Sequence, residues 1–178
     1  MRGTDDRSHD RPTRPDDSTD RMGRRRFVID FHQPAPPEDV FPLLCPTREY
    51  EWIDYWQCRL LYTETGFAEA DCVFSTELES HETWVVTRYE PPEHIDFCIF
   101  TDAEVVVQLK IAVSRRDDGQ ADLRWERTYT STGPSGRDRV QELTAAEVEG
   151  RMRDVNERLA YYLERGDMLR SVRFGNGS

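Results

Sequence analysis

The chain has 178 residues, of which 37% are hydrophobic and 33% charged, and its net charge is −11. This length suits a single domain with one core. Residues 1–26 contain eight Arg, six Asp and no aromatic residue, so the rest of the chain is even more acidic than the whole. Because affinity for a phosphate backbone comes mainly from Lys and Arg, this composition argues against nucleic-acid binding.

Both ends of the chain are expected to lie outside the domain, which we place at 25–168. Residues 1–24 are too polar to offset the entropy lost on ordering, which predicts a disordered tail, and residues 169–178 are predicted as a C-terminal tail. No apolar run is long enough for a membrane span or a signal peptide, so we expect a cytoplasmic protein without membrane insertion. Arginine is abundant and Lys110 is the single lysine, which indicates a GC-rich, bacterial genome.

The first predicted elements are one strand and two short helices. Apolar residues alternate across 25–33 around Phe27 and Phe31, which is typical of a half-buried strand. Prolines then end the strand, and Pro37 with the two acidic residues after it resembles the first turn of a short helix that stops near Pro46. The next segment is predicted as a second short helix or a wide turn. It is rich in aromatic residues: Tyr50, Trp52, Tyr55 and Trp56.

Residues 57–132 predict an antiparallel meander, because turn signals separate apolar segments at regular intervals. The expected strands are 57–65, 71–78, 82–90, 94–101, 103–115 and 121–131. In 103–115 the odd positions from Val105 to Val113 are all apolar, while the even positions include Gln108 and Lys110. This strand therefore has one buried face.

The last predicted element follows a turn at 133–136 and is a helix of about 22 residues, roughly 33 Å long. It begins at Thr144, which forms a capping box with Glu147, and ends at Gly166. Its apolar residues step by three and four and draw one stripe: Val148, Met152, Val155, Leu159 and Tyr162 or Leu163. We expect this stripe and the apolar face of strand 103–115 to cover each other.

This order of elements resembles the helix-grip fold of the START-like SRPBCC superfamily, which includes polyketide cyclases, coenzyme Q-binding proteins, birch-pollen allergens and the activator of a heat-shock ATPase. The similarity covers residues 25–167 and rests on four segments: 36–44, 51–56, 125–129 and the terminal helix to Gly166. It implies an α+β fold in which a curved antiparallel sheet of about seven strands wraps around the long C-terminal helix. The superfamily has no common catalytic motif, so the catalytic residues stay unknown.

The resemblance also implies an apolar cavity between the sheet and the helix, and this cavity is the candidate site. We expect aromatic rings to wall it and to orient a flat hydrophobic ligand with their polar tips. The alternative is that the same rings fill the core. The candidate ligand-binding residues are Trp52, Trp56, Tyr62, Phe74, Trp84, Phe97, Val107, Leu109, Trp125, Arg127, Tyr129, Met152, Val155 and Leu159.

Arg127 is the most informative of these residues. Alternation along 121–131 turns it inward together with Leu123, Trp125 and Tyr129. The residues between them are expected to face solvent: Arg124, Glu126, Thr128 and Thr130. A buried guanidinium needs a partner, which is either an acidic or carbonyl group of the ligand or an internal carboxylate, Glu49, Glu77 or Asp96. An ordinary ion pair or a bulge in the strand would explain Arg127 without a ligand.

Neither a metal site nor a cofactor is expected. The four cysteines lack the spacing of a zinc site and are predicted to be buried free thiols: Cys45, Cys58, Cys72 and Cys98. Motifs for nucleotide binding and for a catalytic nucleophile are missing from the sequence. His32, His81 and His94 have no partner at a useful spacing, so we expect them to be exposed or to cap turns.

Three functions remain open. The first is non-catalytic binding of a hydrophobic small molecule, aromatic, polyketide-like or lipid-like, by a monomer or homodimer. The second is a cyclase, dehydratase or hydrolase in which Arg127 or a buried carboxylate polarises a carbonyl of the ligand, and an inward polar pair would favour it. The third is a protein-interaction module that binds its partner through an acidic convex surface, as the resemblance to the heat-shock ATPase activator implies. We expect the first.

Overall fold

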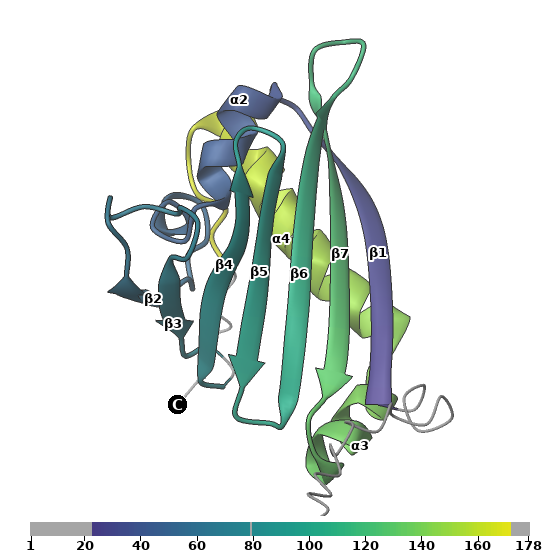
Figure 1. The fold of residues 1–178 in the computed structure, drawn as a ribbon. Coiled ribbons are helices and arrows are strands. Elements are labelled where there is room, and N and C mark those ends of the chain that lie inside the picture. Colours follow the sequence, from purple (N-terminus) through teal and green to yellow (C-terminus); the bar gives the residue numbers. More distant parts are fainter. Residues whose placement is uncertain (1–22, 79, 172–178) are drawn as a thin grey trace, which may run out of the picture.

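The computed structural model describes residues 23–78 and 80–171 (Figure 1). The tail expected at 1–24 lies outside these residues except for its last two, and the C-terminal tail is described only to Ser171. Within the described ranges, no helix is long and apolar enough to cross a membrane.

One antiparallel sheet of seven strands, in the order β1-β7-β6-β5-β4-β3-β2, forms the body of the protein. Its strands are β1 (Arg24–Gln33), β2 (Cys58–Tyr62), β3 (Val73–Thr76), β4 (Glu82–Glu90), β5 (His94–Thr101), β6 (Val105–Arg115) and β7 (Ala121–Ser131). The predicted bounds of β4, β5 and β7 are confirmed, whereas β2 and β3 are shorter than predicted. The register of that hairpin shifts between Leu60 and Tyr62, which breaks the regular pairing.

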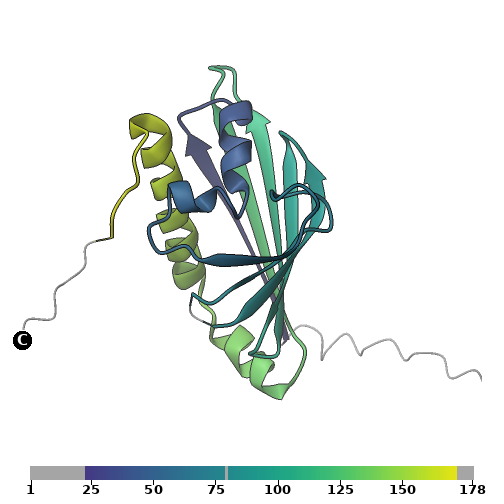
Figure 2. The same ribbon diagram turned by 90° about the vertical axis from the view of Figure 1, so that its left-hand side faces the viewer.

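The helices lie along one face and at both ends of this sheet (Figures 1 and 2). They are α2 (Pro37–Val40), η2 (Phe41–Leu44), η3 (Glu49–Glu51), α3 (Pro134–Glu142) and α4 (Ala145–Arg165). The predicted caps of α4 are confirmed: Thr144 and Glu147 form the capping box, and Gly166 ends the helix with φ 66°. With the curved sheet, this is the helix-grip fold that the sequence predicts.

Helix α3 was not predicted, because residues 133–136 were interpreted as a turn. In the structure Gly133 is the N-cap and Pro134 opens the helix, where its missing N–H costs no hydrogen bond. Gly136 lets this turn of helix lie against the residues just before β6, since a Cβ at 136 would come within 1.9 Å of the backbone oxygen of Glu104. The same residues that suggest a turn thus allow a helix to pack close to a strand.

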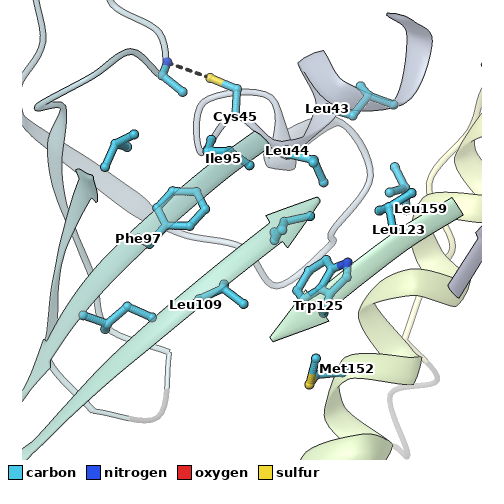
Figure 3. Close-up of a cluster of buried hydrophobic side chains, with 14 of the residues drawn as sticks. Leu43, Leu44, Cys45, Ile95, Phe97, Leu109, Leu123, Trp125, Met152 and Leu159 are labelled. Carbon is cyan, nitrogen blue, oxygen red and sulfur yellow. Dashed lines mark hydrogen bonds between the residues drawn. The ribbon is translucent and has the colours of Figure 1, made fainter. Parts of the chain in front are cut away.

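Helix α4 is held over the β1 edge of the concave face. The fully buried Gln33 donates from Nε2 to the backbone oxygen (3.2 Å) and the Oδ1 (3.1 Å) of Asn156. Met152 and Leu159, which precede and follow Asn156 on the helix, lie in the core, and Figure 3 shows them in the buried cluster that contains Leu123 and Trp125. The helix stripe therefore covers β1 more than β6, contrary to the expected pairing, and leaves the concave face of β4–β6 for a cavity.

The convex face carries exposed ion pairs. Arg124 pairs with Asp30 (2.9 Å) and Arg26 with Glu126 (2.5 Å), so these strand positions face outward as predicted. Thr128 is the exception. It is only 3% exposed, and in the strand register it lies between two residues with longer side chains, Arg26 of β1 and Gln108 of β6.

Candidate functional site

A cavity of about 800 Å³ lies between the concave face of the sheet and α4. Its floor follows the inward rows of β6 and β7, and α4 contributes Arg151, Asp154 and Val155. Residues between η2 and β2, among them Glu49 and Trp56, form the wall at the other side. This volume is within the range of pockets that enclose a drug-sized molecule.

Aromatic rings make up the β3–β5 side of this cavity. The Trp84 ring is stacked on Phe74 with centroids 5.4 Å apart, and it meets Phe97 (5.5 Å) and Trp56 (6.4 Å) edge to face. Both indoles have hydrogen-bond acceptors: Trp84 donates from Nε1 to Glu82 (3.0 Å), and Trp56 to the backbone oxygen of Pro46 (2.8 Å). Their contribution to a ligand is therefore apolar surface rather than polar recognition.

Two polar groups on the cavity floor lack partners. The Nε1 of Trp125 and the Nε of Arg127 are buried donors without a hydrogen bond in the described part of the chain. Both residues point inward from β7 two positions apart, and Trp125 as a whole is 7% exposed. A buried donor without an acceptor costs about 1–3 kcal/mol, so the floor favours a molecule that brings an acceptor.

Within the described residues, Arg127 contacts an aromatic ring but forms no ion pair with a carboxylate. Its guanidinium carbon lies 5.6 Å from the centroid of the Tyr129 ring, a cation–π contact. Of the three carboxylates considered from the sequence, Glu49 and Glu77 line the same cavity without forming an ion pair with it in the described residues. Asp96 lies on the opposite face, between Arg88 and Lys110 in the strand register.

Glu49 is the one carboxyl group whose ionisation the cavity strongly opposes. It extends from η3 into the cavity wall, and burial raises its pKa to about 8. At neutral pH this side chain is therefore mostly a neutral carboxylic acid, able both to donate and to accept a hydrogen bond. The pKa of Glu51, on the same short helix, is shifted in the opposite direction, because its hydrogen bond with Arg48 lowers it.

A buried ion pair fixes the outer wall of the cavity. Arg158 of α4 bonds Asp54 (2.9 Å) and Asp154 (2.9 Å), with both Arg158 and Asp54 largely buried. The same guanidinium donates to the backbone oxygen of Leu169 and to Ser171, and Ser171 donates in turn to Asp54. We call Asp54, Arg158, Leu169 and Ser171 the latch. It ties the segment after η3 to α4 and to residues 169–171, just beyond the domain end expected at 168.

Tyr55 extends the latch toward the cavity. Its ring lies under the guanidinium of Arg158, 4.9 Å from the centroid, and its hydroxyl donates to Asp154 (3.2 Å). Burial, followed by the nearby Asp154 charge, raises the pKa of Tyr55 to about 12, so the hydroxyl keeps its proton and remains a donor. The side chain is 41% exposed and lines the cavity, which places it at the mouth.

Most of the candidate binding residues lie at this cavity or at its neighbour. The larger cavity brings together Trp56, Phe74, Trp84, Phe97, Leu109, Trp125, Arg127 and Val155. A second cavity, of about 390 Å³, is lined by Val107, Arg127 and Tyr129. Four candidates line neither: Met152 and Leu159 belong to the core, Trp52 is fully buried with its Nε1 bonded to Leu43, and Tyr62 is 52% exposed on the edge strand.

Sequence reasoning missed several lining residues. Ile111 follows Leu109 on the apolar face of β6, so alternation alone could have found it. Arg151 and Asp154 flank the predicted helix stripe by one position, and only the rotation of α4 toward β1 brings them to the cavity. Leu44 and Ile53 come from irregular segments, for which no periodic pattern indicates a direction.

The cysteines and the three histidines within the described residues line neither cavity. Each described imidazole has a carboxylate nearby: His32 lies 3.5 Å from Asp122, His81 3.5 Å from Glu77, and His94 3.7 Å from Glu90. All four cysteines are free thiols. Contrary to the prediction, only Cys45 and Cys72 are fully buried, whereas Cys58 and Cys98 are partly exposed at strand positions.

Comparisons with known proteins agree with this architecture. Residues 24–164 match the family model described as polyketide cyclase / dehydrase and lipid transport. No curated protein matches the chain. Among solved structures, CalU16 from Micromonospora echinospora is 17% identical, with 82% of each chain covered and a TM-score of 0.59. Ginseng major latex-like protein 151 from Panax ginseng is 10% identical, with 79% of this chain and 97% of the other covered and a TM-score of 0.60.

A third structure is a longer protein. DynU16, from the dynemicin biosynthetic locus, is 17% identical with a TM-score of 0.58; 80% of this chain matches it but only 48% of DynU16 is covered, so this chain spans about half its length. At these identities the structures share a fold with this chain and nothing finer. The family match covers most of the domain, and with the seven-stranded sheet and the long C-terminal helix it fixes the assignment. The chain belongs to the polyketide cyclase / dehydrase and lipid transport family, within the SRPBCC superfamily.

Proposed function

We propose that this protein binds a hydrophobic, ring-containing or lipid-like small molecule that carries a hydrogen-bond acceptor. The observation that carries the proposal is the pair of unpartnered donors, Trp125 Nε1 and Arg127 Nε, on the floor of an aromatic-walled cavity of about 800 Å³. The apolar walls supply most of the binding free energy, at about 25 cal/mol per Å² buried. A carbonyl, phenolate or carboxylate oxygen of the ligand satisfies the two donors and sets its orientation.

The first experiment identifies the ligand class. Protein purified under mild conditions is analysed by mass spectrometry for retained compounds, and a panel of aromatic and lipid compounds is screened by thermal shift and tryptophan fluorescence. A ligand that binds only the folded state raises the melting temperature. If no compound is retained and none raises the melting temperature, the proposal is wrong.

The second experiment tests Arg127 directly. Arg127→Met keeps much of the side-chain bulk and removes a half-buried cation that has no carboxylate partner in the described residues, so folding stability should stay equal or rise while affinity for the ligand falls at least tenfold. Arg124→Met is the matched control, since Arg124 lies on the same strand but pairs with Asp30 on the convex face. Equal affinities for the wild type and Arg127→Met would exclude Arg127 from ligand binding. A loss of roughly 3 kcal/mol in stability would instead indicate a structural ion pair.

A second candidate function, acid–base catalysis on the bound molecule, is favoured by Glu49. A carboxyl group with a pKa of about 8 can act as a base near neutral pH, and it lies in the same cavity as two donors without partners in the described residues. The Glu49 carboxylate would take a proton from the carbon beside a ligand carbonyl, and Trp125 and Arg127 would donate hydrogen bonds to the enolate oxygen that forms.

Deuterium exchange separates catalysis from simple binding. With 2-tetralone as the probe in D₂O, NMR follows exchange of the hydrogens next to the carbonyl. Exchange should accelerate around pH 8 as Glu49 ionises, and Glu49→Gln should abolish the acceleration while 2-tetralone still binds. If exchange has the same rate in the wild type and in Glu49→Gln, Glu49 is not the base, and only the ligand-binding function remains.

A further inference from the structure

The second cavity continues the first one along the sheet. Glu82, Arg127 and Arg151 line both cavities. In the register of β6 and β7, Ile111 faces Trp125 and Leu109 faces Arg127 in the larger cavity, and the next inward pair, Val107 and Tyr129, lines the smaller one. Arg127 therefore stands at the junction of two chambers.

The two chambers together make a long site. The floor runs along β6 from Ile111 in the larger chamber to Val105 in the smaller, a distance of roughly 20 Å at about 3.3 Å per residue. The far end of the smaller chamber is lined by α3 and the segment after it, with Val140 and Leu143 as their apolar contribution. An elongated molecule that occupies both chambers thus passes Arg127.

The lining of the smaller chamber is less acidic than that of the larger one, because it adds Arg139 to the two arginines that both chambers share and lacks Glu49, Glu77 and Asp154. Arg127, Arg139 and Arg151 line it, and Arg139 has no hydrogen bond or ion pair in the described residues. Of the lining carboxylates, Glu147 is bound to Thr144 in the capping box, which lowers its pKa.

The remaining carboxylates are differently placed. Glu82 accepts hydrogen bonds from Trp84 and Thr76 through one oxygen, and Glu142 is exposed on the last turn of α3. Arg127 and Arg139 therefore keep donors for a ligand, while Glu82 and Glu147 already accept hydrogen bonds within the described residues, which favours an anion. The nearby glutamates disfavour a doubly charged phosphate and make a singly charged carboxylate the better match.

We propose that the smaller chamber binds the carboxylate end of an elongated amphipathic acid whose apolar body fills the larger chamber. Arg127 contacts the ligand where it passes between the chambers, and Arg139 is an exposed cation on the α3 side of the smaller chamber. This inference rests on the proposed function, and it adds the position and the charge of the ligand's polar end. Since Arg139 is exposed, it should contribute a modest charge interaction rather than a large one.

A matched pair of fluorescent probes tests the proposal. 1-Pyrenebutyric acid and 1-pyrenebutanol share the same ring system and differ in the carboxylate, and binding of each is measured by energy transfer from the tryptophans. The acid should bind about tenfold more tightly than the alcohol. Arg139→Met should lower the affinity for the acid by about fivefold and leave the affinity for the alcohol unchanged. Arg137→Met, on the same helix but outside the chamber, should change neither affinity.

Filling the chamber provides a second, independent readout. Leu143→Trp projects a large ring toward the smaller chamber from the end of α3 and should remove the preference for the acid, with circular dichroism confirming the fold. Equal affinities of acid and alcohol for the wild-type protein would overturn the inference while leaving the proposed function intact. If neither probe binds, both the inference and the proposed function are wrong for this class of ligand.

Discussion

Replacing Glu49 by Gln should stabilise the protein increasingly as the pH rises. The carboxyl group has its ordinary pKa of 4.5 in the unfolded chain and about 8 in the folded protein, so the folded state resists ionisation. Below pH 4.5 the acid is neutral in both states and the wild type and variant should be equally stable. As the pH rises from 4.5 to about 8, only the wild type loses stability, because its unfolded state releases the proton at a lower pH than its folded state does.

The size of the effect follows from the two pKa values. A tenfold change in proton affinity is worth about 1.4 kcal/mol, so the wild type should be less stable than Glu49→Gln by up to about 5 kcal/mol at pH 9. This is an upper limit, since water entering the open cavity solvates the carboxylate. Urea denaturation of both proteins at each unit from pH 4 to pH 9 measures the difference directly.

Glu51→Gln is the matched control on the same short helix. Hydrogen bonds with Arg48 and Tyr162 lower the pKa of Glu51, so its carboxylate stabilises the fold above its ordinary pKa and that contribution is lost as the pH falls. The control should therefore be less stable than the wild type at neutral pH and equal to it in acid. Parallel stability curves for the wild type and Glu49→Gln would show that Glu49 is solvated and would refute the assignment.

Two further substitutions separate the core from the cavity and test the latch. Leu159→Ala, in the filled core, should cost about 2–5 kcal/mol in chemical denaturation, whereas Val155→Ala should cost less because it widens an existing cavity; equal costs would contradict this division of α4. Asp54→Asn should cost roughly 3 kcal/mol, because it leaves Arg158 buried with one carboxylate fewer. Its cost should shrink as the pH falls below the pKa of Asp54, which the hydrogen bond from Ser171 lowers, and a cost independent of pH would count against the latch.

The sequence predicts the regular part of this fold well, because burial enforces its periodicities. Strands β4, β5 and β7 begin and end where alternation and turn residues indicate, and α4 is defined by its capping box and by Gly166. Helix α3 escaped prediction because Pro134 and Gly136 are common in turns as well as in the first turn of a helix. Their role depends on the closeness of β6, which no local pattern contains.

The candidate site divides in the same way. Alternation correctly turned Arg127 inward and placed it opposite Leu109. It gave no help with Trp52, which lies in an irregular segment and turns away from the cavity to bond Leu43. Nor could it indicate the neutral state of Glu49, since that depends on how many atoms from distant segments surround one carboxyl group.

The latch has a consequence for how the protein is made. Asp54 and Ser171 are 117 residues apart, so the wall behind Tyr55 and Trp56 depends on the last described residues of the chain. Chains fold from the N-terminus as they are synthesised, and the early strands can pair while the ribosome is still translating α4. This wall can be fastened only once residues 169–171 have left the ribosome. The wall behind Tyr55 and Trp56 is therefore the last part of the cavity that can be completed during synthesis, and no shorter chain can hold a ligand behind it.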